Sequence, residues 1–176
     1  MTQSEHAEIV RRATEGTISL GIDRPFARKF YTDVPLRVIE EQTGEAPYLE
    51  KTFAYACFLG SPTALVASAY FTITTFGWWG VLAIPASIVV WLFYASCSAV
   101  GTSTLRGISV AIVILLALYL LLPEQRMIIS VVLPFGLALW LNRLLYVGAT
   151  AFLRNFIVRN HRAYVFVQDH ITLRGT

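Results

Sequence analysis

The longest stretch without a charged side chain is the feature that most constrains this sequence. From Thr52 to Leu105 the chain contains no Asp, Glu, Lys or Arg over 54 residues. Extending the window to Leu153 adds only four charges, which are Arg106, Glu124, Arg126 and Arg143. The other 21 of the 25 charged residues lie in the first 51 or the last 23 positions. A soluble domain needs charges along its whole length, so this distribution predicts a polytopic membrane protein.

Composition supports the same class of protein and bounds its partners. Charged residues make up 14% of the chain, against about 25% in ordinary globular domains, and mean hydropathy is +0.60. The net charge of +3 is small, and the basic residues flank hydrophobic segments. We therefore expect anionic lipid headgroups, and not nucleic acid, as the partners of these basic residues.

The apolar region divides into four predicted membrane spans, because a spanning helix needs roughly 20 apolar residues. Two glycines bracket a Trp pair in the first turn, residues 76–80, and the later turns fall at residues 101–104 and 123–126. The spans are predicted at about 52–75, 78–99, 104–122 and 127–146. The expected fold is an all-α integral membrane protein made of two helical hairpins, with its transmembrane domain over 52–146.

The distribution of basic residues predicts the orientation of these spans. With four spans, both ends of the chain and the middle loop share one side, which holds twelve Lys and Arg residues. The opposite side holds only Arg126, next to Glu124. The positive-inside rule therefore places both termini in the cytoplasm. No cleavable targeting signal precedes the first span, and this favours the bacterial inner membrane.

The N-terminal segment, 1–51, is predicted to be a cytoplasmic series of short amphipathic helices. One helix is expected to begin near Ser4 and end at Gly16, a second to begin at residues 23–25, and a third to cover 34–42 with Gly44 as its stop. Basic and aromatic residues alternate over 26–31, a pattern that suits the headgroup layer. Arg28 and Lys29 are therefore predicted to contact lipid.

The C-terminal tail, 147–176, is basic and carries an apolar stripe at helical spacing. The stripe contains Leu153, Phe156, Ile157, Asn160, Tyr164, Val167 and Ile171. It predicts a helix to about His161 that lies along the cytoplasmic membrane surface, with Arg154 and Arg159 directed to headgroups. Residues 164–167 and 171–173 also favour strand, so the last fifteen residues stay open between helix and strand.

The spans lack the residues on which most membrane chemistry depends. They contain no Asp, Glu, Lys or His, which removes proton-coupling carboxylates, haem-binding histidines and intramembrane metal clusters. The three histidines lie in the tails and are expected to be solvated, whereas Cys57 and Cys97 are expected to be small buried apolar residues. We therefore expect no catalytic, cofactor or metal site, and not an enzyme.

Arg143 is the ionisable residue placed deepest in a predicted span. It lies 16 residues after Met127, or about 24 Å along a helix that crosses a core roughly 30 Å thick. Two alternatives follow from this position. The side chain either extends to lipid phosphates at the cytoplasmic boundary, or faces the bundle beside Asn142 and binds an anionic group.

Small residues one helical turn apart predict close helix packing, either within one bundle or between subunits. They are Ala95 with Ala99, Cys97 with Gly101, and Gly60 on the first span. The first functional hypothesis is a non-catalytic subunit or scaffold of a homo- or hetero-oligomeric membrane complex. The alternative is a small homo-oligomeric channel or carrier with a path lined by hydroxyl groups. That path would use Thr72, Thr74, Thr75, Ser87, Ser96 and Ser98.

Overall fold

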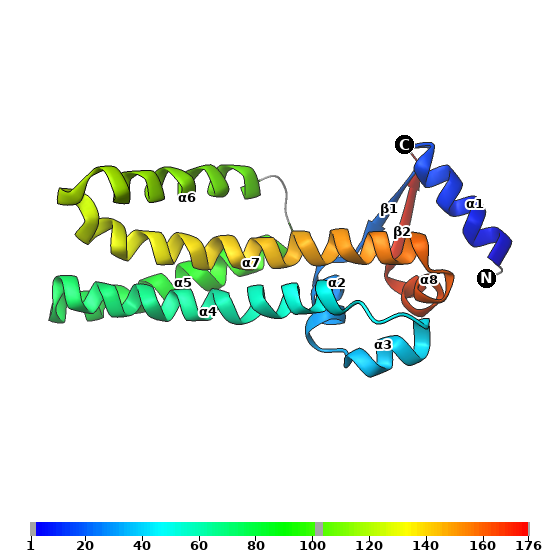
Figure 1. Ribbon diagram of the computed structural model, residues 1–176, viewed down its shortest axis with the longest axis horizontal. Coiled ribbons are helices and arrows are strands. Elements are labelled where there is room, and N and C mark those ends of the chain that lie inside the picture. Colours follow the sequence, from blue (N-terminus) through cyan, green and yellow to red (C-terminus); the bar gives the residue numbers. More distant parts are fainter. Residues whose placement is uncertain (1–2, 101–103, 176) are drawn as a thin grey trace. The chain divides into compact units, whose positions relative to one another are not determined.

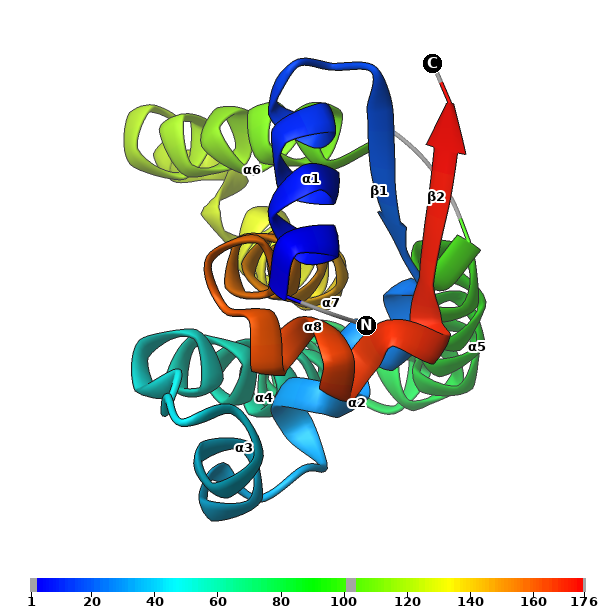
Figure 2. The same cartoon turned by 90° about the vertical axis from the view of Figure 1, so that its right-hand side faces the viewer.

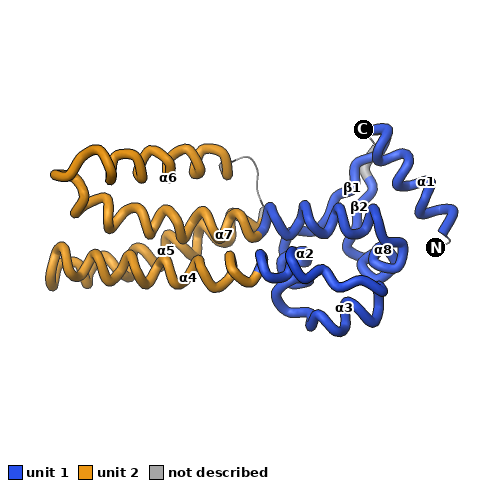
Figure 3. The backbone as a smooth tube through the Cα atoms, in the orientation of Figure 1, with its two compact units in different colours: residues 1–54, 146–176 blue, residues 55–145 orange. Residues whose placement is uncertain are grey.

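The computed structural model describes residues 3–100 and 104–175. Over these residues the chain is mostly helical and contains a two-stranded sheet. It divides into two compact units, which Figure 3 shows in different colours. Unit 1 combines the two ends of the chain, residues 1–54 and 146–176, and unit 2 holds residues 55–145.

Unit 2 is built from long helices that run lengthwise beside one another (Figure 1). They are α4 (Tyr48–Phe76), α5 (Trp78–Val100), α6 (Thr104–Leu121) and α7 (Arg126–Arg159), with the short 3-10 helix η1 (Pro123–Gln125) before α7. The first residues of α4 and the last part of α7 belong to unit 1. The turns at Gly77 and Pro123 lie where the sequence predicts them, and residues 101–103 are outside the described part of the chain.

The length and surface of these helices indicate an integral membrane protein. α4, α5 and the helical stretch Pro123–Arg159 are long and apolar enough to cross a membrane, and Leu105–Leu121 is a shorter apolar helix. Large apolar side chains project from them, for example Val89, Phe93 and Leu121. A continuous apolar surface of this kind is stable in lipid and costly in water.

The predicted turn between the first two spans is tighter in the structure than in the sequence-based expectation. α4 ends at Phe76 and α5 begins at Trp78, so only Gly77 separates them, with φ +59°. Gly80 then lies against the α4 backbone, since a Cβ atom at this position would sit 2.5 Å from the carbonyl oxygen of Thr72. Glycine is needed at this position for the backbones of α4 and α5 to approach so closely.

α7 corrects the predicted end of the fourth helix. The span was expected to end at about Tyr146, but the helix continues without a break to Arg159. Residues 147–159 contain no proline to stop the helix. Side chains of this part of α7 are buried, and their packing stabilises the extended helix. The buried residues are Ala149, Leu153, Phe156 and Ile157.

Unit 1 combines short helices with a sheet that joins the two ends of the chain (Figure 2). Its N-terminal elements are α1 (Gln3–Thr14), β1 (Ile18–Ile22), α2 (Arg24–Thr32) and α3 (Leu36–Thr43). Its C-terminal elements after α7 are α8 (His161–Val167), the 3-10 helix η2 (Gln168–His170) and β2 (Ile171–Gly175). The expected helix stops are confirmed, because Gly16 and Gly44 have φ of +75° and +77°.

The sheet corrects the all-α expectation. β1 pairs with β2 in antiparallel register from Ile18 opposite Gly175 to Ile22 opposite Ile171. The strand alternative for the tail is therefore right for the last segment and wrong for residues 164–167, which are helical. The apolar residues of β1 alternate with period two, but the partner strand lies at the other end of the chain and no local pattern points to it.

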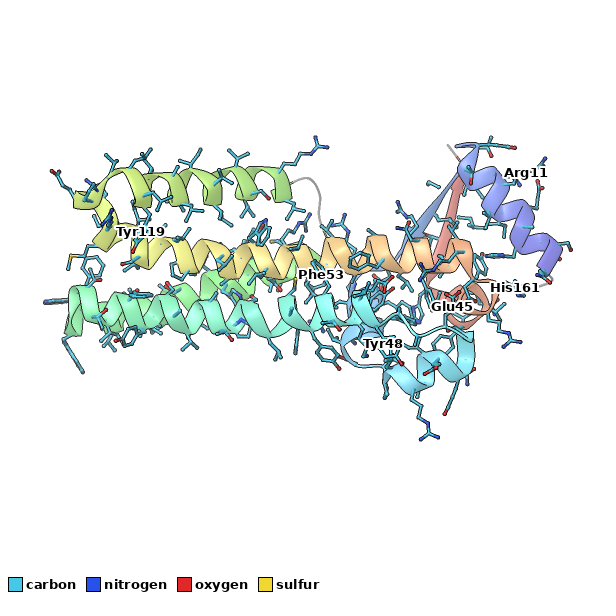
Figure 4. All side chains as sticks on the ribbon, in the orientation of Figure 1. Arg11, Glu45, Tyr48, Phe53, Tyr119 and His161 are labelled. Carbon is cyan, nitrogen blue, oxygen red and sulfur yellow. The ribbon has the colours of Figure 1, made fainter. Side chains whose placement is uncertain are left out.

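The core of unit 1 is formed by side chains that were expected to face lipid. Phe30 and Tyr31 of α2 are buried, and so is Phe156 of α7. The Phe30 ring centroid lies 5.1 Å from that of Tyr31 and 6.4 Å from that of Phe156. Phe53, labelled in Figure 4, and Phe152 add an edge-to-face pair with ring centroids 5.3 Å apart. The apolar faces of the two tails thus pack on each other, because an amphipathic pattern specifies a buried face without specifying its partner.

Candidate functional site

Ser61 is the centre of a group of hydrogen bonds between the helices of unit 2. Its buried hydroxyl donates to the Ala138 carbonyl oxygen of α7 at 2.8 Å and accepts the Trp91 indole N–H of α5 at 3.0 Å. One hydroxyl of α4 therefore links three helices. Ser61 lies next to Gly60, where a Cβ atom would meet the Leu141 side chain at 3.1 Å, so the small residue predicted for packing does lie at a helix contact within unit 2.

Two further hydrogen bonds join helices of unit 2, one again between α4 and α7 and one between α6 and α7. The Ser68 hydroxyl of α4 donates to the Val131 carbonyl oxygen of α7 at 2.9 Å. The Trp140 indole N–H of α7 donates to the Ser109 hydroxyl of α6 at 2.9 Å. In a bilayer such contacts hold helices together, because the helices cannot associate by burying apolar surface from water.

Arg143 lies inside unit 2. It is 2% exposed, and its Nη1 donates to the Ser98 carbonyl oxygen near the end of α5 at 2.8 Å. Carbonyl groups in the last turn of a helix lack a helical partner, and a cation there also interacts favourably with the helix dipole. The side chain thus faces the bundle beside the buried Asn142, and its binding of an anionic group stays a prediction.

Five of the six hydroxyl groups proposed to line a path, all but that of Thr75, donate to carbonyl oxygens of their own helices. Thr72, Thr74 and Ser87 donate to carbonyl oxygens of Ser68, Tyr70 and Ala83 at 2.7–3.1 Å. Ser96 and Ser98 do the same with Leu92 and Tyr94. A hollow of about 440 Å³ nevertheless opens between α4, α5 and α7, and its lining includes Ser68, Thr72 and Ser87.

The other predicted packing residues have no assigned contact. Ala95 and Ala99 are half-buried on α5, and Gly101 lies outside the described residues. Cys57 is buried as expected, whereas Cys97 is exposed, and both are free thiols.

The predicted lipid-contact residues of unit 1 occupy two kinds of environment. Arg159 lies 3.6 Å from carboxylate oxygens of both Glu45 and Glu50, so acidic neighbours balance its charge. Arg154 and Lys29 are exposed on α7 and α2. Arg28 is half-buried, and its guanidinium carbon lies 5.7 Å from the centroid of the Tyr146 ring.

Lys51 stabilises the end of α2, a role that the sequence pattern does not reveal. It is the last charged residue before the charge-free run and is buried in unit 1. Its Nζ donates to the carbonyl oxygen of Tyr31 at 3.1 Å and to that of Val34. Burial raises the pKa of the nearby Tyr31 phenol above its usual value, with a smaller contribution from the Glu50 carboxylate.

Two histidines from opposite ends of the chain meet in unit 1, where sequence reasoning placed them in solvent. The ring centroids of His6 and His161 lie 5.2 Å apart, and that of Tyr164 lies 5.3 Å from His6. His6 Nε2 is 2.9 Å from the Ile157 carbonyl oxygen. His161 is labelled in Figure 4. Burial raises the pKa of Tyr164. Within residues 3–100 and 104–175, no group of three or more His, Cys, Asp or Glu side chains could hold a metal ion.

These features define the class of protein: a mostly helical integral membrane protein whose two ends fold together in one compact unit. Comparison with protein families, curated proteins and solved structures finds no match to this chain. The function is therefore inferred from the geometry of the chain itself.

Proposed function

We propose that this protein is a non-catalytic subunit or scaffold of an oligomeric membrane complex. The observation that carries the proposal is the use of the polar side chains in unit 2. Ser61, Ser68, Trp91, Trp140 and Arg143 are all hydrogen-bonded between helices. Such an arrangement stabilises a bundle, whereas catalysis or ion coupling needs polar groups that converge on a reacting or transported species.

The channel or carrier alternative rests on the hollow lined by Ser68, Thr72 and Ser87. A neutral solute could use the lone pairs of these hydroxyl oxygens. Their protons, however, are donated to backbone carbonyls, so they offer a solute acceptors only. This limitation favours the subunit proposal over the carrier.

A topology of four spans with both termini on one side completes the proposal. β1 precedes the first long apolar helix and β2 follows the last, and the two strands pair. Paired strands must lie on the same side of the membrane, which requires an even number of crossings between them. The apolar helix of α6 has 17 residues, or about 26 Å at 1.5 Å per residue, which is at the short end of the spanning range. The bias of Lys and Arg supports a cytoplasmic location for both termini, in a bacterial inner membrane.

The apolar outer surface and the basic ends suggest the kinds of partner. Exposed large apolar residues cover α5, for example Leu82, Val89 and Phe93. Lipid chains or the helices of other subunits would cover this surface in the membrane. Further copies of the chain or other membrane proteins are the proposed partners, together with anionic headgroups at the basic ends.

The proposal is tested by purifying the protein from its native membrane in mild detergent and measuring the mass of the particle. The subunit proposal is supported by a reproducible complex that contains further copies or other proteins and does not release solute from liposomes. A monomer contradicts it. Release of a trapped solute by the reconstituted protein alone would favour the carrier.

A further inference from the structure

Arg28 is held in place by the core of unit 1. Its neighbours on α2, Ala27 and Phe30, are fully buried, and this fixes the face of α2 that turns inward. Arg28 itself is half-buried, and its guanidinium carbon lies 5.7 Å from the centroid of the Tyr146 ring. A guanidinium over an aromatic face is attracted by the ring and restricted in orientation.

Tyr146 fixes the level of this cation relative to the proposed membrane. It lies at the end of the proposed fourth span, about 127–146, on α7. Tyrosine is enriched at the interface between hydrocarbon and water, where lipid phosphates lie. The placement rests on the proposed membrane topology, and it puts Arg28 at the height of the cytoplasmic headgroups.

The charge of Arg28 has no acidic partner among the described residues. Neither Arg28 nor Lys29 forms an ion pair there, in contrast to Arg159, which lies beside Glu45 and Glu50. The Arg28 Nε is buried and has no hydrogen-bond acceptor in the described part of the chain. An ordered guanidinium with unused donors is suited to a phosphate, which accepts two parallel hydrogen bonds from its terminal nitrogens.

We propose that Arg28, supported by the Tyr146 ring and assisted by the exposed Lys29, binds the phosphate of an anionic phospholipid in the cytoplasmic leaflet. A lipid, and not soluble phosphate, is the occupant because the cation sits at the cytoplasmic end of the proposed fourth span. Arg37 marks the contrast. Its Nε lies 2.7 Å from a carboxylate oxygen of Glu41, so its charge is already paired.

The test measures lipid retained by the full-length protein. The protein is exchanged in detergent with either phosphatidylglycerol or phosphatidylcholine, and bound lipid is counted by native mass spectrometry. The wild type is expected to retain phosphatidylglycerol preferentially, also in excess inorganic phosphate. Arg28→Gln is expected to weaken retention by about tenfold, the effect of losing one charge-assisted contact, whereas the control Arg37→Gln retains the lipid.

Two further variants keep the proposal testable if Arg28→Gln fails to fold. Arg28→Lys preserves the charge but not the planar fork, and Tyr146→Leu preserves apolar bulk but not the aromatic face. Each variant is expected to weaken lipid retention by a few fold. Each is also expected to have the same circular dichroism spectrum as the wild type. Equal retention by wild type and all three variants, equal retention of phosphatidylcholine, or an equal loss in Arg37→Gln would overturn the site. The mass of the native complex is measured separately, so failure of the lipid site is distinguishable from failure of the subunit proposal.

Discussion

Replacing Ser61 by alanine tests whether hydrogen bonds between helices hold unit 2 together. The change removes the hydroxyl that donates to the Ala138 carbonyl and accepts the Trp91 indole N–H. Hydrogen bonds between membrane helices contribute about 0.6 kcal/mol on average and up to about 1.7 kcal/mol each. Losing two of them is therefore expected to lower the free energy of unfolding by about 1–3 kcal/mol.

Thr63→Ala is the matched control on the same helix. The Thr63 side chain is exposed, and its hydroxyl returns to the Leu59 carbonyl oxygen of α4 at 2.8 Å. Its loss removes no contact between helices and is expected to change stability by less than about 0.5 kcal/mol. The two variants differ mainly in whether the lost hydroxyl joins one helix to another.

The assay is reversible unfolding in mixed micelles with increasing dodecyl sulfate, followed by circular dichroism. A double-mutant cycle with Trp91→Phe isolates the Ser61–Trp91 bond and is expected to give a coupling free energy of about 0.6–1.7 kcal/mol. If Ser61→Ala is no less stable than Thr63→Ala and the cycle gives no coupling, the hydrogen bonds do not stabilise the bundle and the reasoning fails.

Three other substitutions have expected outcomes. Gly80→Ala places a methyl group against the Thr72 carbonyl and should lower the free energy of unfolding by about 1–3 kcal/mol. The control Gly107→Ala meets no atom within 4 Å and should be neutral or stabilising in the same unfolding assay. Lys51→Met removes the donor to two carbonyls at the end of α2 and should make unit 1 more sensitive to limited proteolysis, unlike the exposed Lys29→Met. The buried phenol of Tyr31 has a raised pKa. Its contribution to the stability of the folded protein is therefore complete below about pH 10 and is lost as pH rises through the folded-state pKa. Tyr31→Phe should remove that alkaline loss of stability, as measured by thermal unfolding against pH.

The sequence predicted unit 2 well because its signals are local. Hydropathy and length define a membrane helix within one segment, and Gly77 and Pro123 mark its turns. The direction of the Arg143 side chain could not be read from the sequence, because the rotation of a helix about its axis depends on neighbours that are distant in sequence. The same reason hid the partners of Ser61, although small residues there predicted close packing.

The packing of unit 1 could not be predicted, because its contacts join the two ends of the chain. The apolar stripe that contains Leu153 and Phe156 was recognised, but a stripe looks the same whether it faces lipid or protein. The pairing of β1 with β2 is a contact of this kind, and so is the approach of His6 to His161. Periodicity identifies which residues are buried, and only the folded chain identifies what they are buried against.

Thiol labelling in the membrane tests the central claim that the paired chain ends share one side of an even number of spans. Cys57 and Cys97 are replaced by alanine, and single cysteines are introduced as Ala7→Cys, Asp169→Cys or Glu124→Cys. An impermeant maleimide added from outside should label the cysteine at position 124 and should reach positions 7 and 169 only after permeabilisation. Labelling of positions 7 and 169 from opposite sides would contradict the account.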